Sequence, residues 1–91
     1  MEIEWDSAKA KKNEKKHQVS FLEASSVFHD PLAITGDDPD HSIGESRFIT
    51  FGTSSAGNLL AISHTYRNEK IRIISARRAT KGEKVIYYEE G

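Results

Sequence analysis

The residues best suited to chemistry lie near the C-terminus, in the stretch "HTYRNEKIRIISARRA" that runs from His64 to Ala79. Its imidazole can move protons near neutral pH. Its arginines carry forked donors that match the oxygens of a phosphate. Metal-free RNA cleavage needs these groups, because the RNA supplies its own 2′-hydroxyl as nucleophile and the protein orients it and stabilises the charge that develops. The same residues also fit a hydrogen-bonded sheet histidine surrounded by surface charge.

Other chemistries are less well supported. The four histidines are scattered, there is no cysteine, and the acidic run Asp37, Asp38 and Asp40 lacks the glycine and distal glutamate of a calcium loop. No glycine-rich phosphate loop is present. The run "GTSSAG" reads as a turn, in which a serine nucleophile would still need a base and an oxyanion hole. We therefore predict neither a metal site nor a cofactor.

Charge is strongly segregated along the 91 residues, although the net charge is only −1. Residues 9–17 carry a local charge of +4, residues 30–45 carry −5, and residues 64–84 carry +5. Clusters of this kind can bind polyanions. The lysine run at 9–17 also fits a plain solvated face, or a contact with a partner or ribosomal RNA. With no long apolar run and no signal-peptide pattern, we expect a cytoplasmic protein without membrane contact.

Local signals predict two helices in the first third of the chain. "EIEW" alternates like a short strand, and Asp6 is a good N-cap for the helix "SAKAKKNEKKH". Ser20 is the N-cap candidate for the next helix, with Glu23 at capping-box spacing. In that helix Phe21, Ala24, Val27 and Phe28 form an apolar face that ends before Asp30-Pro31.

The rest of the chain is predicted as four strands and a final helix. The strand candidates are "LAIT", "RFITFGT", "NLLAISHTY" and "IRIISAR", and "GDDPDHSIGE" is an exposed loop. Thr80 would cap the helix "KGEKVIYYEE". The order is β-α-α-β-β-β-β-α, an α+β fold with a small antiparallel sheet, two N-terminal helices and one C-terminal helix. We expect a single domain over residues 1–91.

The hairpin register decides which residues share a face of the sheet. If Asn68 and Glu69 form the tip, His64 opposes Ile73 and Ile62 opposes Ser75. Strict alternation then places Leu60, Ile62, His64, Tyr66, Ile71, Ile73, Ser75 and Arg77 toward the helices. The opposite face receives Ala61, Ser63, Thr65, Arg67, Arg72, Ile74, Ala76 and Arg78. This second face, small and cationic, is the predicted phosphate-binding surface.

Several motifs together resemble one protein family. The opening "IEWDSAKAKKNEKKHQVSFLEASSVFHDPLA" and the later "RFITFG", "HTYR" and "RIISARRAT" are similar to the signatures of the BrnT-type toxins of bacterial type II toxin–antitoxin systems. The resemblance runs from end to end. It implies a RelE-like fold and a ribonuclease that inhibits translation.

The same resemblance implies partners and site residues. The partners would be an RNA substrate and a BrnA-like ribbon-helix-helix antitoxin, with operator DNA bound only through the antitoxin complex, in which the chain could form a homodimer. Position by position, it assigns catalysis to His64, Arg67, Arg77 and Arg78. It assigns RNA binding to Arg47 and Thr65, and the cationic hairpin itself adds Lys70 and Arg72 as predicted RNA-binding residues. Lys9, Asn13 and His17 match the N-terminal signature and are interpreted as structural or partner-facing.

Two positions depart from the family pattern. Gln18 stands where a glycine is expected at a left-handed helix end. The last helix also has fewer arginines than expected, which would weaken RNA binding. A rival function therefore stays open: a non-catalytic partner- or nucleic-acid-binding module of a repressor complex.

Overall fold

The computed structural model describes residues 2–38 and 44–90. The elements follow the predicted order: β1 (Ile3–Glu4), α1 (Ser7–His17), α2 (Phe21–Ser26) with the 3-10 turn η1 (Val27–His29), β2 (Ile34–Asp37), β3 (Phe48–Thr53), β4 (Leu59–Arg67), β5 (Lys70–Arg78) and α3 (Lys81–Glu90). The loop predicted at 36–45 contains residues 39–43, which lie outside the described part of the chain, as does the Asp40 of the acidic run.

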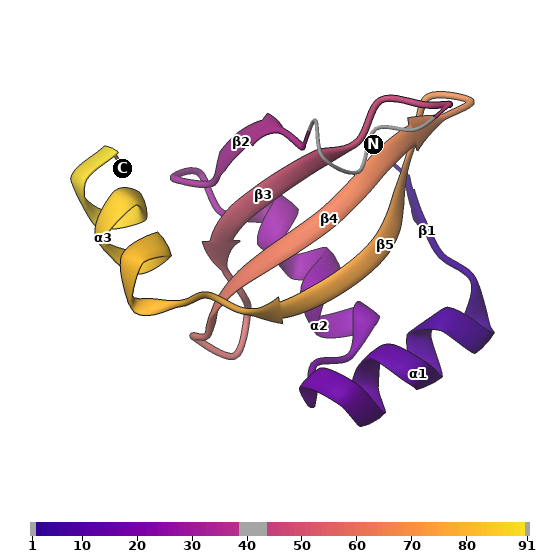
Figure 1. Cartoon of the computed structure of the whole chain (residues 1–91), viewed down its shortest axis with the longest axis horizontal. Coiled ribbons are helices and arrows are strands. Elements are labelled where there is room, and N and C mark those ends of the chain that lie inside the picture. Colours follow the sequence, from indigo (N-terminus) through magenta and orange to yellow (C-terminus); the bar gives the residue numbers. More distant parts are fainter. Residues whose placement is uncertain (1, 39–43, 91) are drawn as a thin grey trace.

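The five strands form one sheet in the order β1-β5-β4-β3-β2 (Figure 1). The β2–β3, β3–β4 and β4–β5 pairs are antiparallel, as expected for a meander. The prediction of a wholly antiparallel sheet was wrong at one edge, because Ile3 and Glu4 pair in parallel with Ile71 and Arg72. β1 and β5 are separated in the chain by α1, α2 and three other strands. A connection of this length allows the two strands to run in parallel, which a tight turn would not.

The predicted helix caps are confirmed. The Asp6 carboxylate accepts from the Lys9 amide at 2.9 Å, and the Ser20 hydroxyl accepts from the Glu23 amide at 3.0 Å. At α3, the Thr80 hydroxyl accepts from the Glu83 amide at 3.2 Å, and Glu83 accepts from the Thr80 amide at 2.8 Å, a reciprocal capping box.

The core lies between the sheet and the two N-terminal helices. Its fully buried members include Phe21, Val27, Leu60, Ile62 and Ile73. In Figure 1, α2 lies behind the sheet, whereas α3 stands beyond the end of β3. No helix of the described residues packs on the opposite face of β3, β4 and β5, and we call it the open face.

A β-bulge changes which side chains reach the open face. His64 pairs with Ile73, as predicted, but Ser63 then pairs with Ser75, so that Ile74 is an extra residue in β5. The predicted pairing of Ile62 with Ser75 was wrong: Ile62 pairs with Ala76, and both are fully buried. In β5 the predicted faces are correct up to Ile74 and reversed from Ser75 onward. Ser75 and Arg77 lie on the open face, and Ala76 and Arg78 lie on the helix side.

The side chain of Asn13 connects α1 to the free edge of β5 by hydrogen bonds. Its side-chain nitrogen donates to the carbonyl oxygens of Ala76 (2.8 Å) and Val19 (3.0 Å), and its oxygen accepts from the Ala76 amide at 3.1 Å. The side chain is buried and thus completes the strand edge as a neighbouring strand would. None of the described helices is long and apolar enough to cross a membrane.

Candidate functional site

The open face contains a polar cleft with a volume of about 430 Å³. Ile49 and Ile74 give it an apolar floor. Its polar lining residues are His17, Asp38, Arg47, Ser63, Ser75 and Arg77. Arg47 directly precedes β3, Ser63 comes from β4, and His17 ends α1. Ser75 and Arg77 reach the cleft because the bulge at Ile74 turns them to this face.

Arg77 is held in the cleft by α3. Its guanidinium donates to both carboxylate oxygens of Glu83, at 2.7 and 2.9 Å. This hydrogen bond is the main reason why the pKa of Glu83 falls to about 2, and it raises the pKa of Arg77. The arginine stays 37% exposed, so its charge is partly offset but still accessible from the cleft.

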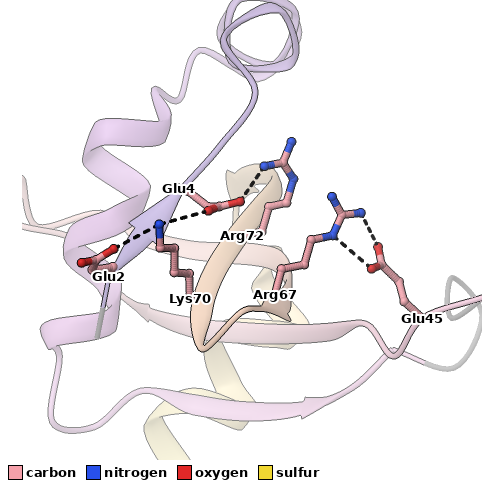
Figure 2. A network of polar contacts seen from close by, with 6 residues as sticks. All are labelled: Glu2, Glu4, Glu45, Arg67, Lys70 and Arg72. Carbon is pink, nitrogen blue, oxygen red and sulfur yellow. Dashed lines mark hydrogen bonds and ion pairs between the residues drawn. The ribbon is translucent and has the colours of Figure 1, made fainter.

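The other cations of the hairpin end form a network with carboxylates (Figure 2). Arg67 donates to both oxygens of Glu45 at 3.2 and 3.3 Å, and Arg72 donates to Glu4 at 2.7 Å. Lys70 lies 3.3 Å from Glu2. The hydrogen bond from Arg67 also lowers the pKa of Glu45. The predicted face is therefore rich in arginine, but in-chain acids offset the charge of these three cations.

The structure places His64 in the core, outside the cleft. Its side chain is 0% exposed, its Nε2 lies 2.7 Å from the Thr50 hydroxyl, and its Nδ1 has no hydrogen-bond partner among the described residues. The rings of Phe28, Phe48 and Tyr66 surround it. Burial lowers the pKa of His64 to about 4, so the ring is neutral at physiological pH.

Two other predicted residues also lie away from the cleft. Thr65 is buried and donates its hydroxyl to the Ser46 carbonyl at 2.7 Å. Arg78, on the helix side, donates to the Asn58 side chain at 2.8 Å. Of the eight predicted site residues, only Arg47 and Arg77 line the cleft, while Arg67, Lys70 and Arg72 form the separate network.

Sequence reasoning missed four polar residues of the cleft, namely His17, Asp38, Ser63 and Ser75. His17 matches the N-terminal signature and is predicted from the sequence to be structural or partner-facing. Ser75 had been assigned to the wrong face by strict alternation. No local signal in "IRIISAR" marks the bulge, because the apolar residues on both sides of it satisfy either register.

Fold and cleft together define a small α+β protein whose open sheet face carries a polar cleft with two arginines and two serine hydroxyls. Residues 5–83 match the model of the family described as the ribonuclease toxin BrnT of type II toxin–antitoxin systems, and the chain belongs to this family.

A solved structure supports the fold. The chain is similar to the ribonuclease toxin BrnT of Brucella abortus, whose crystal structure was determined at 1.1 Å resolution. The two share 21% sequence identity and superpose with a TM-score of 0.68, over 89% of this chain and 99% of the other. No curated protein matches the chain.

Proposed function

We propose that this chain is a metal-independent endoribonuclease that cuts cellular RNA and so inhibits translation. The observation that carries the proposal is the convergence of Arg47, Arg77 and His17 on one open cleft. Two guanidiniums, one directly before β3 and one from β5, can hold the non-bridging oxygens of one phosphate and stabilise the extra negative charge of a phosphorane. Ser63 and Ser75 add hydroxyl donors to the lining of the same cleft.

For proton transfer we propose His17, which reaches the cleft and is partly exposed. An imidazole there could take the proton from the RNA 2′-hydroxyl or give one to the leaving oxygen. The assignment of proton transfer to His64 stays a prediction. It would require the ring to leave a site in which it is fully buried.

The partner follows from membership of a toxin–antitoxin family. We propose that a BrnA-like ribbon-helix-helix antitoxin neutralises the chain in the cytoplasm. Its acidic segment would cover the open face, because one contact would then both offset charge and block RNA. Operator DNA would be bound only through this complex, in which two toxin chains would assemble.

The proposal is tested with purified, antitoxin-free protein and single-stranded RNA in the presence of EDTA. The wild type should cleave, and Arg77→Ala should lower the rate by about 10²–10³-fold, since it removes a stabiliser of the transition-state charge. Glu83→Gln is the control, because it weakens the same ion pair but keeps the arginine. Intact RNA after incubation with the wild type would refute the proposal.

The two histidines are separated by their substitutions. We expect His17→Ala to reduce cleavage by about 10²–10⁴-fold with an unchanged melting temperature, and His64→Phe to alter stability rather than cleavage by the folded fraction. The reverse pattern would return the catalytic role to His64. In bacteria, induction without the antitoxin should stop growth and bulk translation, and co-expression of the antitoxin should restore both.

The rival function, a non-catalytic binding module, is favoured by one observation. Arg67, Lys70 and Arg72 are paired with acids, which would suit a surface that exchanges these pairs for a partner's carboxylates. RNA binding that falls steeply with salt, without any cleavage, would select this function.

A further inference from the structure

A second hollow continues the cleft along α1. It is lined by Lys9, Lys12, Asn13 and Lys16, and it shares His17, Ile74 and Ser75 with the cleft. The two hollows therefore meet at the bulge of β5 and form one path from the open face to the side of α1. We call this second hollow the α1 groove.

The position of the α1 groove is fixed by buried contacts. Asn13 lies between the groove lysines on the helix and is bonded to both backbone groups of Ala76. The lysines are exposed, but the turns that carry them are thus held against β5. A ligand in the groove would meet them without a rearrangement of the backbone, which lowers the entropic cost of binding.

Charge distinguishes the groove from the hairpin network. Lys9, Lys12 and Lys16 have no ion-pair partner among residues 2–38 and 44–90, whereas Arg67, Lys70 and Arg72 each face a carboxylate. A cation in an ion pair must lose its contact with the carboxylate before it can bind a phosphate. An unpaired lysine releases only weakly held counterions. The three lysines therefore add positive charge along the α1 groove that no ion pair of the described residues offsets.

We propose that the α1 groove is a second subsite for the RNA backbone, which holds phosphates flanking the one in the cleft. The proposal rests on the proposed function, since the groove would bind the same RNA strand that the cleft cuts. Lys9 and Lys16 are seven residues apart, about 10 Å along a helix. This length can follow two or more phosphates of a stacked strand, which repeat every ~3.4 Å. Among its described lining residues Ile74 is the one apolar side chain, and none is Phe, Tyr or Trp, so the groove would contact the RNA backbone and be largely indifferent to sequence.

The test compares two pairs of lysines on the same helix. Lys12→Gln/Lys16→Gln removes two charges from the groove. Lys11→Gln/Lys15→Gln removes two charges with the same spacing from another face of α1, where Lys11 and Lys15 line a separate hollow with Glu14. The probe is a 2′-O-methyl single-stranded RNA long enough to span both hollows, which binds but cannot be cut. Its affinity is measured by fluorescence anisotropy at several salt concentrations.

We expect the groove pair to bind at least about tenfold more weakly at ~0.1 M salt and to lose about 1.4 from the slope of log affinity against log salt. The control pair should keep the wild-type slope. Equal effects of the two pairs would overturn the proposal, since they would reflect general charge alone. An unchanged slope for the groove pair, together with weaker capture of the antitoxin, would also overturn it and assign the groove to the protein partner.

The proposed function and the proposed subsite are tested by separate measurements, so that either can be refuted without the other. Cleavage of a dinucleotide by the wild type depends on the cleft and is measured without the long probe. A wild type that cuts no RNA but shows the expected difference in slope between the two pairs would refute the nuclease and retain the groove.

Discussion

At the scale of single residues, Gln18 shows how one position deviates from its local preference. It ends α1 in the left-handed region, with φ 56° and ψ 33°, and its amide donates to the Glu14 carbonyl. Glycine is favoured there because a Cβ raises the energy of this conformation. The glutamine side chain offsets part of the cost by donating to the Lys15 carbonyl at 3.0 Å.

We predict that Gln18→Gly is more stable than Gln18→Ala by about 1 kcal/mol. Both substitutions remove the side-chain bond to Lys15, so the comparison isolates the backbone term. Urea unfolding at neutral pH measures the difference. Equal stability of the two variants would mean that the helix end relaxes out of the left-handed conformation.

His64 makes stability depend on pH. Its pKa is about 4 in the folded chain, below the ordinary 6.5, because burial disfavours the charged ring. The unfolded chain therefore takes up a proton first as the pH falls. The contribution of His64 to stability is complete above pH 6.5 and is lost progressively between pH 6.5 and about 4.

We predict that the free energy of unfolding is lower by about 2 kcal/mol at about pH 5 than at about pH 7.5. His64→Phe, which suits the surrounding rings, should remove most of this dependence. Urea unfolding at the two pH values provides the measurement. A dependence that persists in His64→Phe would assign it to another group.

At the scale of elements, the close approach of η1 to β3 depends on Gly52. A Cβ at this position would lie 2.7 Å from Val27 Cγ1 and 3.1 Å from Ala33 Cβ. Val27 belongs to the core, so it has little room to retreat. The glycine is therefore required by packing.

We predict that Gly52→Ala destabilises the fold by about 1–3 kcal/mol, because the added methyl overpacks the core. Gly36→Ala is the control, since a Cβ on Gly36 in β2 meets nothing within 4 Å. Thermal unfolding of both variants tests the contrast. Similar melting temperatures would show that η1 can shift away from the sheet.

The last helix is attached by polar contacts rather than by a broad apolar face. Tyr87 is buried and donates its hydroxyl to Asp30, and Glu83 binds Arg77 and caps the helix. Burial alone would raise the pKa of Asp30, but donors from Thr53, Tyr87 and Leu32 keep it below its ordinary value. Val85, Ile86 and Tyr88 remain exposed on the outer side.

We predict that α3 loosens in acid before the sheet unfolds. Glu83 has a pKa of about 2 in the folded chain and 4.5 ordinarily, so its contribution is present above pH 4.5 and is lost as the pH falls toward 2. We expect the hydrogen-exchange protection of the α3 amides, relative to the unfolded chain, to decrease before that of the sheet as the pH falls through this range. In Glu83→Gln the exchange should be fast already at neutral pH, and protection equal to that of the wild type would contradict the assignment.

At the scale of the whole molecule, charge is distributed so that the hairpin and the N-terminal helix differ. Acids from the N-terminus and from the segment before β3 neutralise the hairpin cations, whereas the lysines at 9–16 remain on an exposed helix. Exposed ion pairs contribute little to stability. The carboxylates therefore affect ligand binding more than folding.

We predict that Glu4→Gln/Glu45→Gln binds single-stranded RNA several-fold more tightly, with a salt slope steeper by about 0.7 for each arginine released. Glu69→Gln/Glu89→Gln changes the net charge equally at two exposed positions and is the matched control. Anisotropy with the uncleavable RNA compares them. The same gain in both would reflect total charge rather than release of Arg67 and Arg72.

The sequence by itself determined the elements, their order and the family. Caps at Asp6, Ser20 and Thr80 and the stop at Asp30-Pro31 are local signals, since each acts within one turn of the residue that carries it. The hairpin tip at Asn68–Glu69 was also predicted from the sequence. Both residues have a positive φ, as a tight turn of this kind requires.

Only the tertiary structure decided which side chains meet. The extra residue Ile74 in β5 exchanges the faces on which Arg77 and Arg78 lie. The alternation of residue types along the sequence does not predict this bulge. Ion pairs with Glu2, Glu4 and Glu45 join positions far apart in the chain. The burial of His64 depends on rings from η1, β3 and β4. Local energies select elements, but the position of a charge or a proton depends on what the completed fold packs around it.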